Sequence, residues 1–563
     1  MLTRHAVRAP TIPLWLVWAV ALIMVFSGLS GFAILDNNEG LYAEIAREMR
    51  AAGDWHQWVI PHLNGLPYME KPPLLYWLTA LAFSLFGESE WSARLVPAFS
   101  ALFCVGLLLW FGKAQNRPLA GRLAALMFVS GLGMLAMSHV LMFDMLLTAL
   151  LTAALMCAYR FDSEQNSTYL RWAYAWLALA LLAKGLVALA LFGLVIGSFT
   201  LLRSMAIRSF VPMSQWFDLR AFAVFFIIVL PWHIAASLTE PIFAWFYFMN
   251  EHVLRFLGQR EPHDYYAGPW WYYLPRMVIY LFPWSFLLPC LLFKKVPLLQ
   301  QQGPLQMFLG LAWLMPLAFF SFSSAKANYY LVAVMPLLTF HLATAIEARG
   351  FFNRMGRALP GVLIAALAGG LAVVLIMRGV NFQPNDATDH FYGALSTSQF
   401  VLMAFCATAG LAMVAALTAW RLPKIGILAY LLLPILSMTL LMMSLQAMDA
   451  TTSMRATAHY LRTEQSDLRI YLYRDFEQQS SLAFYLQQPL PVVDMRSNDL
   501  YWGDKLRPQN SINIDSRQFA ERLASQKIAL VVNDRHIDEF SASDLFAAFK
   551  GSKRMGKNTL FFN

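Results

Sequence analysis

The stretch LDNNEGLYAEIAREM, residues Leu35–Met49, begins where the first long apolar run of the chain, 12–35, stops. It places acidic and amide side chains at the mouth of a predicted membrane helix. Apolar residues then recur with i, i+3, i+4, i+7 spacing, and charged residues occupy the other side, so we expect a helix lying on the membrane surface. The alternative is that the helix is only capped by the polar residues at its start, Asp36, Asn37 and Asn38.

The composition is that of a membrane protein. Of 563 residues, 59% are hydrophobic and 13% are charged, which is more apolar surface than a soluble fold can bury. The net charge of +9 does not indicate nucleic-acid binding, because the basic residues lie in short loops between apolar runs. Short basic loops face the cytoplasm, so these residues orient the protein instead.

Hydropathy and length predict a polytopic α-helical protein with about thirteen spans. Lys184-Gly185 breaks one pair of spans, and the apolar piece Pro72–Phe86 is short enough to be re-entrant or interfacial. The predicted spans are 12–35, 91–112, 119–138, 140–159, 171–183, 185–202, 221–238, 272–293, 305–322, 328–347, 359–377, 398–419 and 425–446.

Two domains are expected. The membrane domain covers 1–446, with a cytoplasmic N-terminus carrying Arg4 and Arg8, and its long first loop, 36–90, faces outward with interfacial helices. Residues 447–563, the C-terminal domain, also face outward and read as a small soluble α/β domain. Its expected strands are 469–473 and 527–532, and its expected helices are 480–487 and 516–525. It has no glycine-rich phosphate loop, which favours a structural or docking role.

Ionisable residues gather near the outer ends of the predicted spans. Such groups are costly at membrane depth, so they usually pair or function, although each alone could be a snorkelling side chain or an interface anchor. Together they suit one reaction type, in which cations hold a lipid-linked phosphate as a leaving group and a carboxylate acts on an acceptor. The candidate cations are Lys71, Lys184, Arg255 and Lys326, and the candidate carboxylates are Asp36, Glu39 and Asp144.

A metal site and substrate contacts by aromatic residues are two further possibilities, and each has a non-functional alternative. Glu70 and His252 could bind a divalent metal, but two ligands far apart in sequence do not define a site. Tyr330, after Lys326, could touch substrate or belong to the aromatic belt of the membrane interface, as could the run Pro269–Pro275.

Several of these segments resemble the bacterial lipid A aminoarabinose transferases, which belong to the protein-mannosyltransferase-like GT-C glycosyltransferases. The first-loop segments Asn38–Met49, Gly53–Trp55 and Ile60–Pro73 carry the specific part of the resemblance. Supporting matches are Val140–Asp144, Ala183–Gly185, Leu230–Trp232, Glu251–Phe256, Pro269–Pro275, Pro283-Trp284 and Ser324–Lys326 with Tyr330. The resemblance covers the membrane part up to about residue 340.

The resemblance implies a membrane enzyme that moves a sugar, such as 4-amino-4-deoxy-L-arabinose, with inversion. The donor would be an undecaprenyl-phosphate sugar, and the acceptor would be lipid A or a related envelope glycan at the periplasmic face of the inner membrane. Lys71 and Arg255 would hold the donor phosphate, and Asp144 with a first-loop acid would lie at the reaction centre. Tyr68 and Tyr330 would line the site, and Glu70 with His252 would bind any metal.

One departure from the family pattern concerns the first-loop acid. The family usually has Asp-Glu where this chain has Asn38-Glu39, and the nearest Asp is Asp36. An amide cannot act as a general base, so Asp36 or Glu39 takes the role, or no strong base is needed. The last case suits a phosphate acceptor, which is already ionised at neutral pH.

Other readings stay open at this stage. The same chemistry could act on a protein hydroxyl or an O-antigen glycan. A different class, a transporter of polyprenyl phosphate or lipid, would bind the same anion without reacting. Such a binder does not need acids beside its cations, and the chain lacks the internal inverted repeat typical of many secondary transporters.

Overall fold

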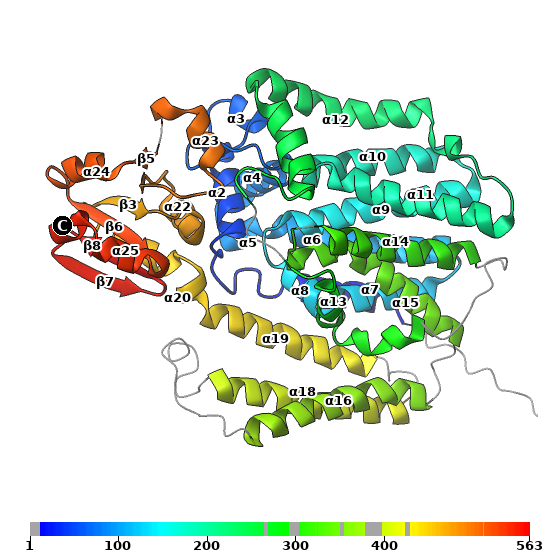
Figure 1. Ribbon diagram of the computed structural model, residues 1–563. Coiled ribbons are helices and arrows are strands. Elements are labelled where there is room, and N and C mark those ends of the chain that lie inside the picture. Colours follow the sequence, from blue (N-terminus) through cyan, green and yellow to red (C-terminus); the bar gives the residue numbers. More distant parts are fainter. Residues whose placement is uncertain are drawn as a thin grey trace, which may run out of the picture.

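The computed structural model describes residues 12–263, 268–291, 303–323, 325–349, 354–377, 397–422, 428–510 and 512–563. Arg4, Arg8 and Ser324 lie outside these ranges. Long helices, many of them side by side, make up most of the molecule, and a smaller sheet-containing region lies at one end of them (Figure 1).

Nine of the described helical segments are long and apolar enough to cross a membrane, or eleven if two bent pairs each count as one span. The polytopic helical class is therefore confirmed, whereas the predicted count of thirteen is not reached within the described ranges. The nine are α6 (Leu95–Ala114), α9 (Phe143–Glu164), α11 (Val187–Ile207), α12 (Leu219–Thr239), α14 (Gly303–Phe322), η4 with α15 (Asn328–Val334 and Met335–Arg349), α16 (Arg354–Met377), α18 (Thr397–Arg421) and α19 (Leu432–Ala447).

The bent pairs correct two predicted spans. Helices α7 (Pro118–Val129) and α8 (Leu132–Ser138) meet at 66°, and α13 (Tyr273–Leu281) and η3 (Trp284–Leu291) meet at 119°. The two breaks lie against each other, since the Leu132 amide donates to the Phe282 carbonyl at 3.0 Å. Each break thus finds partners for backbone groups that an interrupted helix leaves unpaired. Mean hydropathy over a window of residues does not register such breaks, so each bent pair was predicted as one span, 119–138 and 272–293.

Other interruptions follow the local sequence. Helix α10 (Ser167–Lys184) ends at Gly185, whose φ of 85° favours glycine, as the predicted break required. Helix α4 (Leu74–Phe86) has 13 residues, which agrees with a segment too short to span. The predicted span 12–35 was too long, because α1 (Leu14–Phe26) also has only 13 residues.

Helix α2 (Asn38–Ala51) contains the opening motif, and its placement differs from the prediction. Instead of exposing its charged side, it buries both sides. Glu44 and Arg47 form a buried ion pair at 2.7 Å, and the Glu48 carboxylate accepts a hydrogen bond from the Gly65 amide. Because α2 lies between α4 and the C-terminal helix α22 (Ser480–Leu486), its polar side chains have protein partners in place of water.

The C-terminal domain contains a six-stranded sheet with the order β5-β4-β3-β6-β8-β7. Strands β5 to β6 pair in parallel and β8 pairs antiparallel with both its neighbours. The predicted strands and helices are present, while β4, β5, β7 and β8 were not predicted. The bounds are β3 (Arg469–Tyr473), β4 (Val492–Val493), β5 (Asn513–Ile514), α24 (Ser516–Leu523), β6 (Ile528–Asn533), β7 (Gly551–Met555) and β8 (Asn558–Phe562). The domain boundary at residue 447 stays a prediction.

Short elements complete the described chain. They are α3 (His56–Val59), β1 (His62–Leu63), β2 (Leu66–Pro67), α5 (Glu90–Ala93), η1 (Met213–Trp216), η2 (Trp245–Leu254), η5 (Leu428–Leu431), α20 (Asp449–Thr452), α21 (Arg455–Glu464), η6 (Glu477–Gln479), α23 (Tyr501–Leu506), η7 (Pro508–Asn510), η8 (Asp534–His536), α25 (Ile537–Ser541) and η9 (Asp544–Ala548).

Candidate active site

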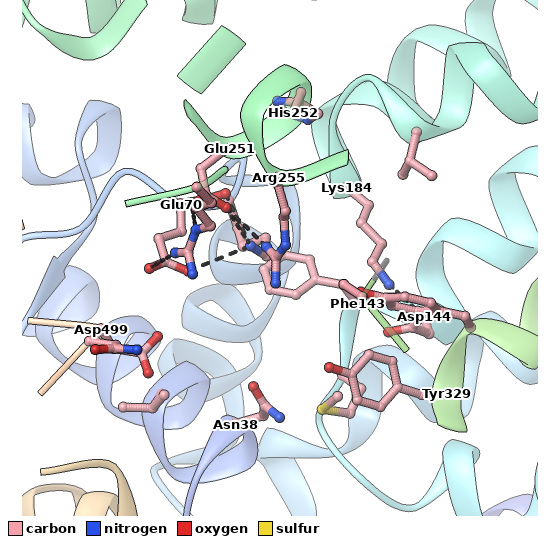
Figure 2. Close-up of a pocket in the computed structure, with 18 of the residues that line it drawn as sticks. Asn38, Glu70, Phe143, Asp144, Lys184, Glu251, His252, Arg255, Tyr329 and Asp499 are labelled. Carbon is pink, nitrogen blue, oxygen red and sulfur yellow. Dashed lines mark hydrogen bonds and ion pairs between the residues drawn. The ribbon is translucent and has the colours of Figure 1, made fainter. Parts of the chain in front are cut away.

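A cavity of about 950 Å³ lies between the membrane helices and the C-terminal domain (Figure 2). Its wall combines residues of α2, the first loop, α9, α10, η2 and the C-terminal domain. The sequence-predicted residues that line it are Tyr68, Glu70, Lys71, Asp144, Lys184, His252, Arg255 and Tyr330. The cavity thus brings together residues that are far apart in the chain.

A carboxylate surrounded by cations forms one side of the cavity. The buried Glu251 accepts from Arg255 at 3.0 Å and from Lys71 at 3.4 Å on one oxygen, and its other oxygen contacts Arg260. Arg260 also contacts Glu70 at 2.5 Å. Burial alone would raise the pKa of Glu251, but the nearby cations outweigh it and lower that pKa to about 2. We call these five residues the Glu251 cluster.

A second charged pair faces the first from the membrane helices. Asp144, in the first turn of α9, forms an ion pair with Lys184 at the end of α10. The Lys184 ammonium lies 4.7 Å from the ring centre of Tyr330 and 5.3 Å from that of Tyr329. In Figure 2 this pair lies across the view from Glu70 and Glu251. Lys184 therefore balances an acid and contacts aromatic faces while it lines the cavity.

The C-terminal domain supplies another part of the wall. Asp499 lies beside the Tyr68 hydroxyl, which is 3.4 Å from both the Asp499 and the Glu70 carboxylates. Burial, together with the charges of Glu70 and Glu477, raises the pKa of Asp499 well above its usual value. Further lining residues from this domain are Asp475, Glu477, Gln478, Asn498, Arg535 and His536.

The structure places two predicted catalytic acids outside the cavity wall. Asp36 accepts hydrogen bonds from the Ser481 amide and hydroxyl, at 3.0 and 2.7 Å, and so joins the first loop to the C-terminal domain. Burial raises the pKa of Asp36 to about 7, although both Ser481 bonds oppose that shift. Glu39 is buried in an ion pair with Arg94. Asn38, at the family's Asp position, does line the cavity. A direct role for Asp36 or Glu39 in this arrangement therefore has no geometric support.

Lys326 also serves the fold in this arrangement. Its ammonium donates to the carbonyl oxygens of Phe320, Ser321 and Ser323, at 3.0, 2.6 and 2.6 Å. These groups lie at the end of α14, where helix carbonyls have no intrahelical partner. Lys326 is therefore a C-terminal cap of α14, and it is not among the residues that line the cavity.

The geometry does not fit Glu70 and His252 as a metal pair. His252 Nε2 accepts from the Leu186 amide at 3.0 Å, and Nδ1 lies 2.6 Å from the Tyr247 carbonyl oxygen. Both ring nitrogens are thus engaged, while Glu70 contacts Arg260. In the described ranges, no group of three or more His, Cys, Asp or Glu side chains is arranged to hold a metal ion. A metal requirement stays an untested prediction.

Sequence reasoning missed Arg260 and the wall from the C-terminal domain. Arg260 follows η2 in a polar segment without a motif, and its side chain is 6% exposed. A signal was available in its spacing, because Glu251, Arg255 and Arg260 recur at four- and five-residue intervals. Asp499 carried no such signal, since 431 residues separate it from Tyr68.

The arrangement can bind an amphipathic anion. The cations of the Glu251 cluster suit a phosphate, because charge-assisted hydrogen bonds favour it. Apolar side chains continue the same cavity and suit a hydrocarbon chain. They are Leu186, Val187, Ala190, Phe256, Leu257, Phe319 and Phe320.

Comparisons with known proteins agree with this geometry. Residues 70–234 match the family described as dolichyl-phosphate-mannose-protein mannosyltransferase. An undecaprenyl phosphate-alpha-4-amino-4-deoxy-L-arabinose arabinosyl transferase from Shewanella sediminis is 33% identical over 60% of this chain and 60% of its own length. A protein of the same name from Pseudomonas savastanoi pv. phaseolicola is 30% identical over 71% of this chain and 72% of its own.

A solved structure shares the fold. The crystal structure of ArnT from Cupriavidus metallidurans bound to undecaprenyl phosphate matches with a TM-score of 0.81 and 24% sequence identity. The match covers 97% of both chains. The apo form of the same protein matches with a TM-score of 0.79.

Proposed function

Because the chain belongs to the family of undecaprenyl phosphate-aminoarabinose arabinosyl transferases, we propose that it is a GT-C glycosyltransferase of the bacterial inner membrane. It is a multi-pass protein, and it transfers 4-amino-4-deoxy-L-arabinose from an undecaprenyl-phosphate donor to lipid A or a related envelope acceptor. The observation that carries this proposal is one cavity in which phosphate-binding cations adjoin an apolar wall.

The donor phosphate would lie against Lys71 and Arg255. In the reaction, the bond between the anomeric carbon and the phosphate oxygen breaks, and an acceptor oxygen bonds to that carbon. Undecaprenyl phosphate leaves with the electron pair of the broken bond. The two cations stabilise the negative charge that develops on this oxygen, which lowers the barrier. Tyr68 and Tyr330 line the space left for the sugar.

A phosphate acceptor fits this site better than a hydroxyl. A phosphate on lipid A is already ionised at neutral pH, whereas a hydroxyl must lose a proton to a base. Two of the described acids near the cations are engaged, Asp144 with Lys184 and Glu251 with Arg260. A third, Asp499, has a pKa raised by burial well above its usual value, which favours its protonated form. Asp144 would therefore orient the acceptor and not deprotonate it. A protein hydroxyl or an O-antigen acceptor would need a base that is not already paired.

We also propose the orientation of the chain. The C-terminal domain would lie in the periplasm, since it forms part of the wall of a cavity that receives periplasmic lipid A. The N-terminus would be cytoplasmic, as the basic residues Arg4 and Arg8 suggest. Reporter fusions at the two ends, active only in the periplasm or only in the cytoplasm, would test this topology.

The decisive experiment incubates purified protein with an undecaprenyl-phosphate aminosugar and lipid A. Mass spectrometry should detect lipid A carrying the added sugar, together with free undecaprenyl phosphate. Donor cleavage with a different acceptor would move the assignment to a protein or O-antigen substrate. Binding without any cleavage of the donor would contradict the enzyme proposal and favour a transporter.

A further inference from the structure

Two hydrogen bonds between Asn250 and Glu261 fix the segment that contains Arg260. The Asn250 side chain donates to the Glu261 carbonyl at 2.8 Å and accepts from the Glu261 amide at 3.0 Å. This reciprocal pair ties the chain after η2 back onto η2 itself. Asn250 is fully buried, so these bonds do not compete with water. These bonds hold Arg260 in contact with Glu251.

The C-terminal domain also contacts Glu261. Trp502 Nε1 in α23 donates to the Glu261 carbonyl at 2.9 Å, and the Tyr501 hydroxyl donates to the Glu261 carboxylate at 2.9 Å. The Trp502 ring packs against Phe246 of η2, with ring centres 5.5 Å apart. The domain therefore contacts the residue next to Arg260 in the chain, through both polar and aromatic contacts.

Arg260 determines which carboxylate oxygen of Glu251 contacts the other cations. Its guanidinium contacts one oxygen of Glu251 and one oxygen of Glu70. The other Glu251 oxygen is left to Lys71 and Arg255. Without Arg260, both Glu251 oxygens would be available to those two cations, which would draw them away from a phosphate.

We propose that the C-terminal domain positions the donor-phosphate cations, and that Arg260 is the positioning residue through which it acts. The order of contacts runs from Trp502 and Tyr501 to Glu261, then by the chain to Arg260, and from Arg260 to Glu251. The domain thus sets the affinity of the membrane site for the lipid phosphate. The inference rests on the proposed function, because it takes the ligand of Lys71 and Arg255 to be a polyprenyl phosphate.

The test measures binding of undecaprenyl phosphate to the full-length protein in detergent, together with transfer kinetics. Arg260→Gln should weaken binding by about 10- to 100-fold, the range for losing a charge-assisted contact. Arg260→Lys keeps the charge and should recover part of the affinity. Trp502→Phe keeps an aromatic ring in this contact but removes the N–H donor and part of the indole ring system, so a loss of about 3- to 10-fold is expected. Tyr501→Phe, which removes a single hydroxyl, provides a milder second variant.

Arg507 offers a matched control for the domain contact. It follows α23 and forms an ion pair with Glu240 at 2.6 Å. Within the described part of the chain, its side chain contacts neither Glu261 nor the Glu251 cluster. Arg507→Gln should therefore leave the affinity within about 2-fold of the parent chain, which is the scatter of such measurements. In the double variant of Arg260→Gln and Trp502→Phe, the loss should not exceed that of Arg260→Gln alone, because both changes act through one route.

Two results would overturn the inference. One is unchanged affinity in both the Trp502→Phe and Tyr501→Phe variants; the other is fully additive losses in the double variant. Failure of the proposed function looks different, since the parent chain itself would then fail to bind undecaprenyl phosphate. A KM for donor that rises in Trp502→Phe while kcat stays constant would support positioning over general loss of structure.

Discussion

Two buried clusters of guanidinium and carboxylate groups differ in how they are placed relative to the cavity. In the first, Arg94 donates to both oxygens of Glu39, at 2.8 and 3.0 Å. Arg94 also donates to the carbonyl oxygens of Leu29, Phe32 and Ala33, and Glu39 accepts from the Leu35 and Leu141 amides. Both side chains are at most 1% exposed. We call this the closed pair.

The Glu251 cluster differs in its access to the cavity. The Arg255 side chain is 24% exposed, and it lines the cavity together with Lys71 and Arg260. A closed pair whose donors and acceptors satisfy one another stabilises the fold and offers little to a ligand. A cluster of cations that lines a cavity can exchange part of its contacts for an anion. The comparison teaches that access to a cavity, more than the presence of charge, distinguishes the Glu251 cluster from the closed pair.

The largest effect should come from opening the closed pair. Arg94→Ala leaves Glu39 charged and buried without its partner, which costs roughly 3–5 kcal/mol of folding free energy. Thermal unfolding of the purified protein in detergent would show a much lower midpoint or an unfolded variant. If Arg94→Ala unfolded like the parent chain, the pair would not be the structural element described here.

Removing a cavity cation should affect catalysis and spare the fold. Lys71→Ala removes a contact to the leaving phosphate, so transfer should fall by about 100-fold or more, with an unchanged unfolding midpoint. Lys326→Gln is the matched control, since Lys326 caps α14 and should matter for stability and not for transfer. Normal turnover by Lys71→Ala would contradict the assignment of the cluster.

A substitution in the ion pair of Asp144 and Lys184 would test whether an acid in the cavity is functional. Asp144→Asn removes a negative charge from the wall, so affinity for undecaprenyl phosphate should hold or rise. Transfer should nevertheless fall by about 10- to 100-fold, because the acceptor loses a positioning group. Parallel losses in binding and transfer would instead indicate a structural pair. Measuring kcat and donor affinity separately distinguishes these outcomes.

The last prediction concerns the pH dependence of stability at the contact between Asp36 and Ser481. Its pKa is raised to about 7 in the folded protein, above the ordinary value of 3.8, chiefly by burial. The folded state therefore holds this proton more tightly than the unfolded state does. Its contribution to stability is complete below about pH 4 and is lost as the pH rises toward 7. Asp36→Asn should flatten this part of the stability profile, measured by unfolding from pH 4 to 8. An unchanged slope would contradict the burial of a protonated Asp36.

Local sequence features predicted much of the site. The cations Lys71, Lys184 and Arg255 and the acid Asp144 were expected on one outer level, and the structure places them around one cavity. Their roles remain predictions. Asp36, Glu39 and Lys326 met the same criterion, an ionisable group near a span end, but the fold gives each of them partners elsewhere. That criterion detects costly charges and does not tell how they are compensated.

The sequence alone determined the polytopic helical class of this protein and the strands β3 and β6, because hydropathy and periodicity are properties of neighbouring residues. Only the tertiary structure decided which charges saturate one another. The contact between Asp36 and Ser481 joins residues 445 positions apart, and Trp502 reaches Glu261 across 241. Pairing over such separations depends on distances in space, which no local pattern encodes. The same dependence on tertiary contacts buries Glu39 against Arg94 and places the Glu251 cluster in the wall of a cavity.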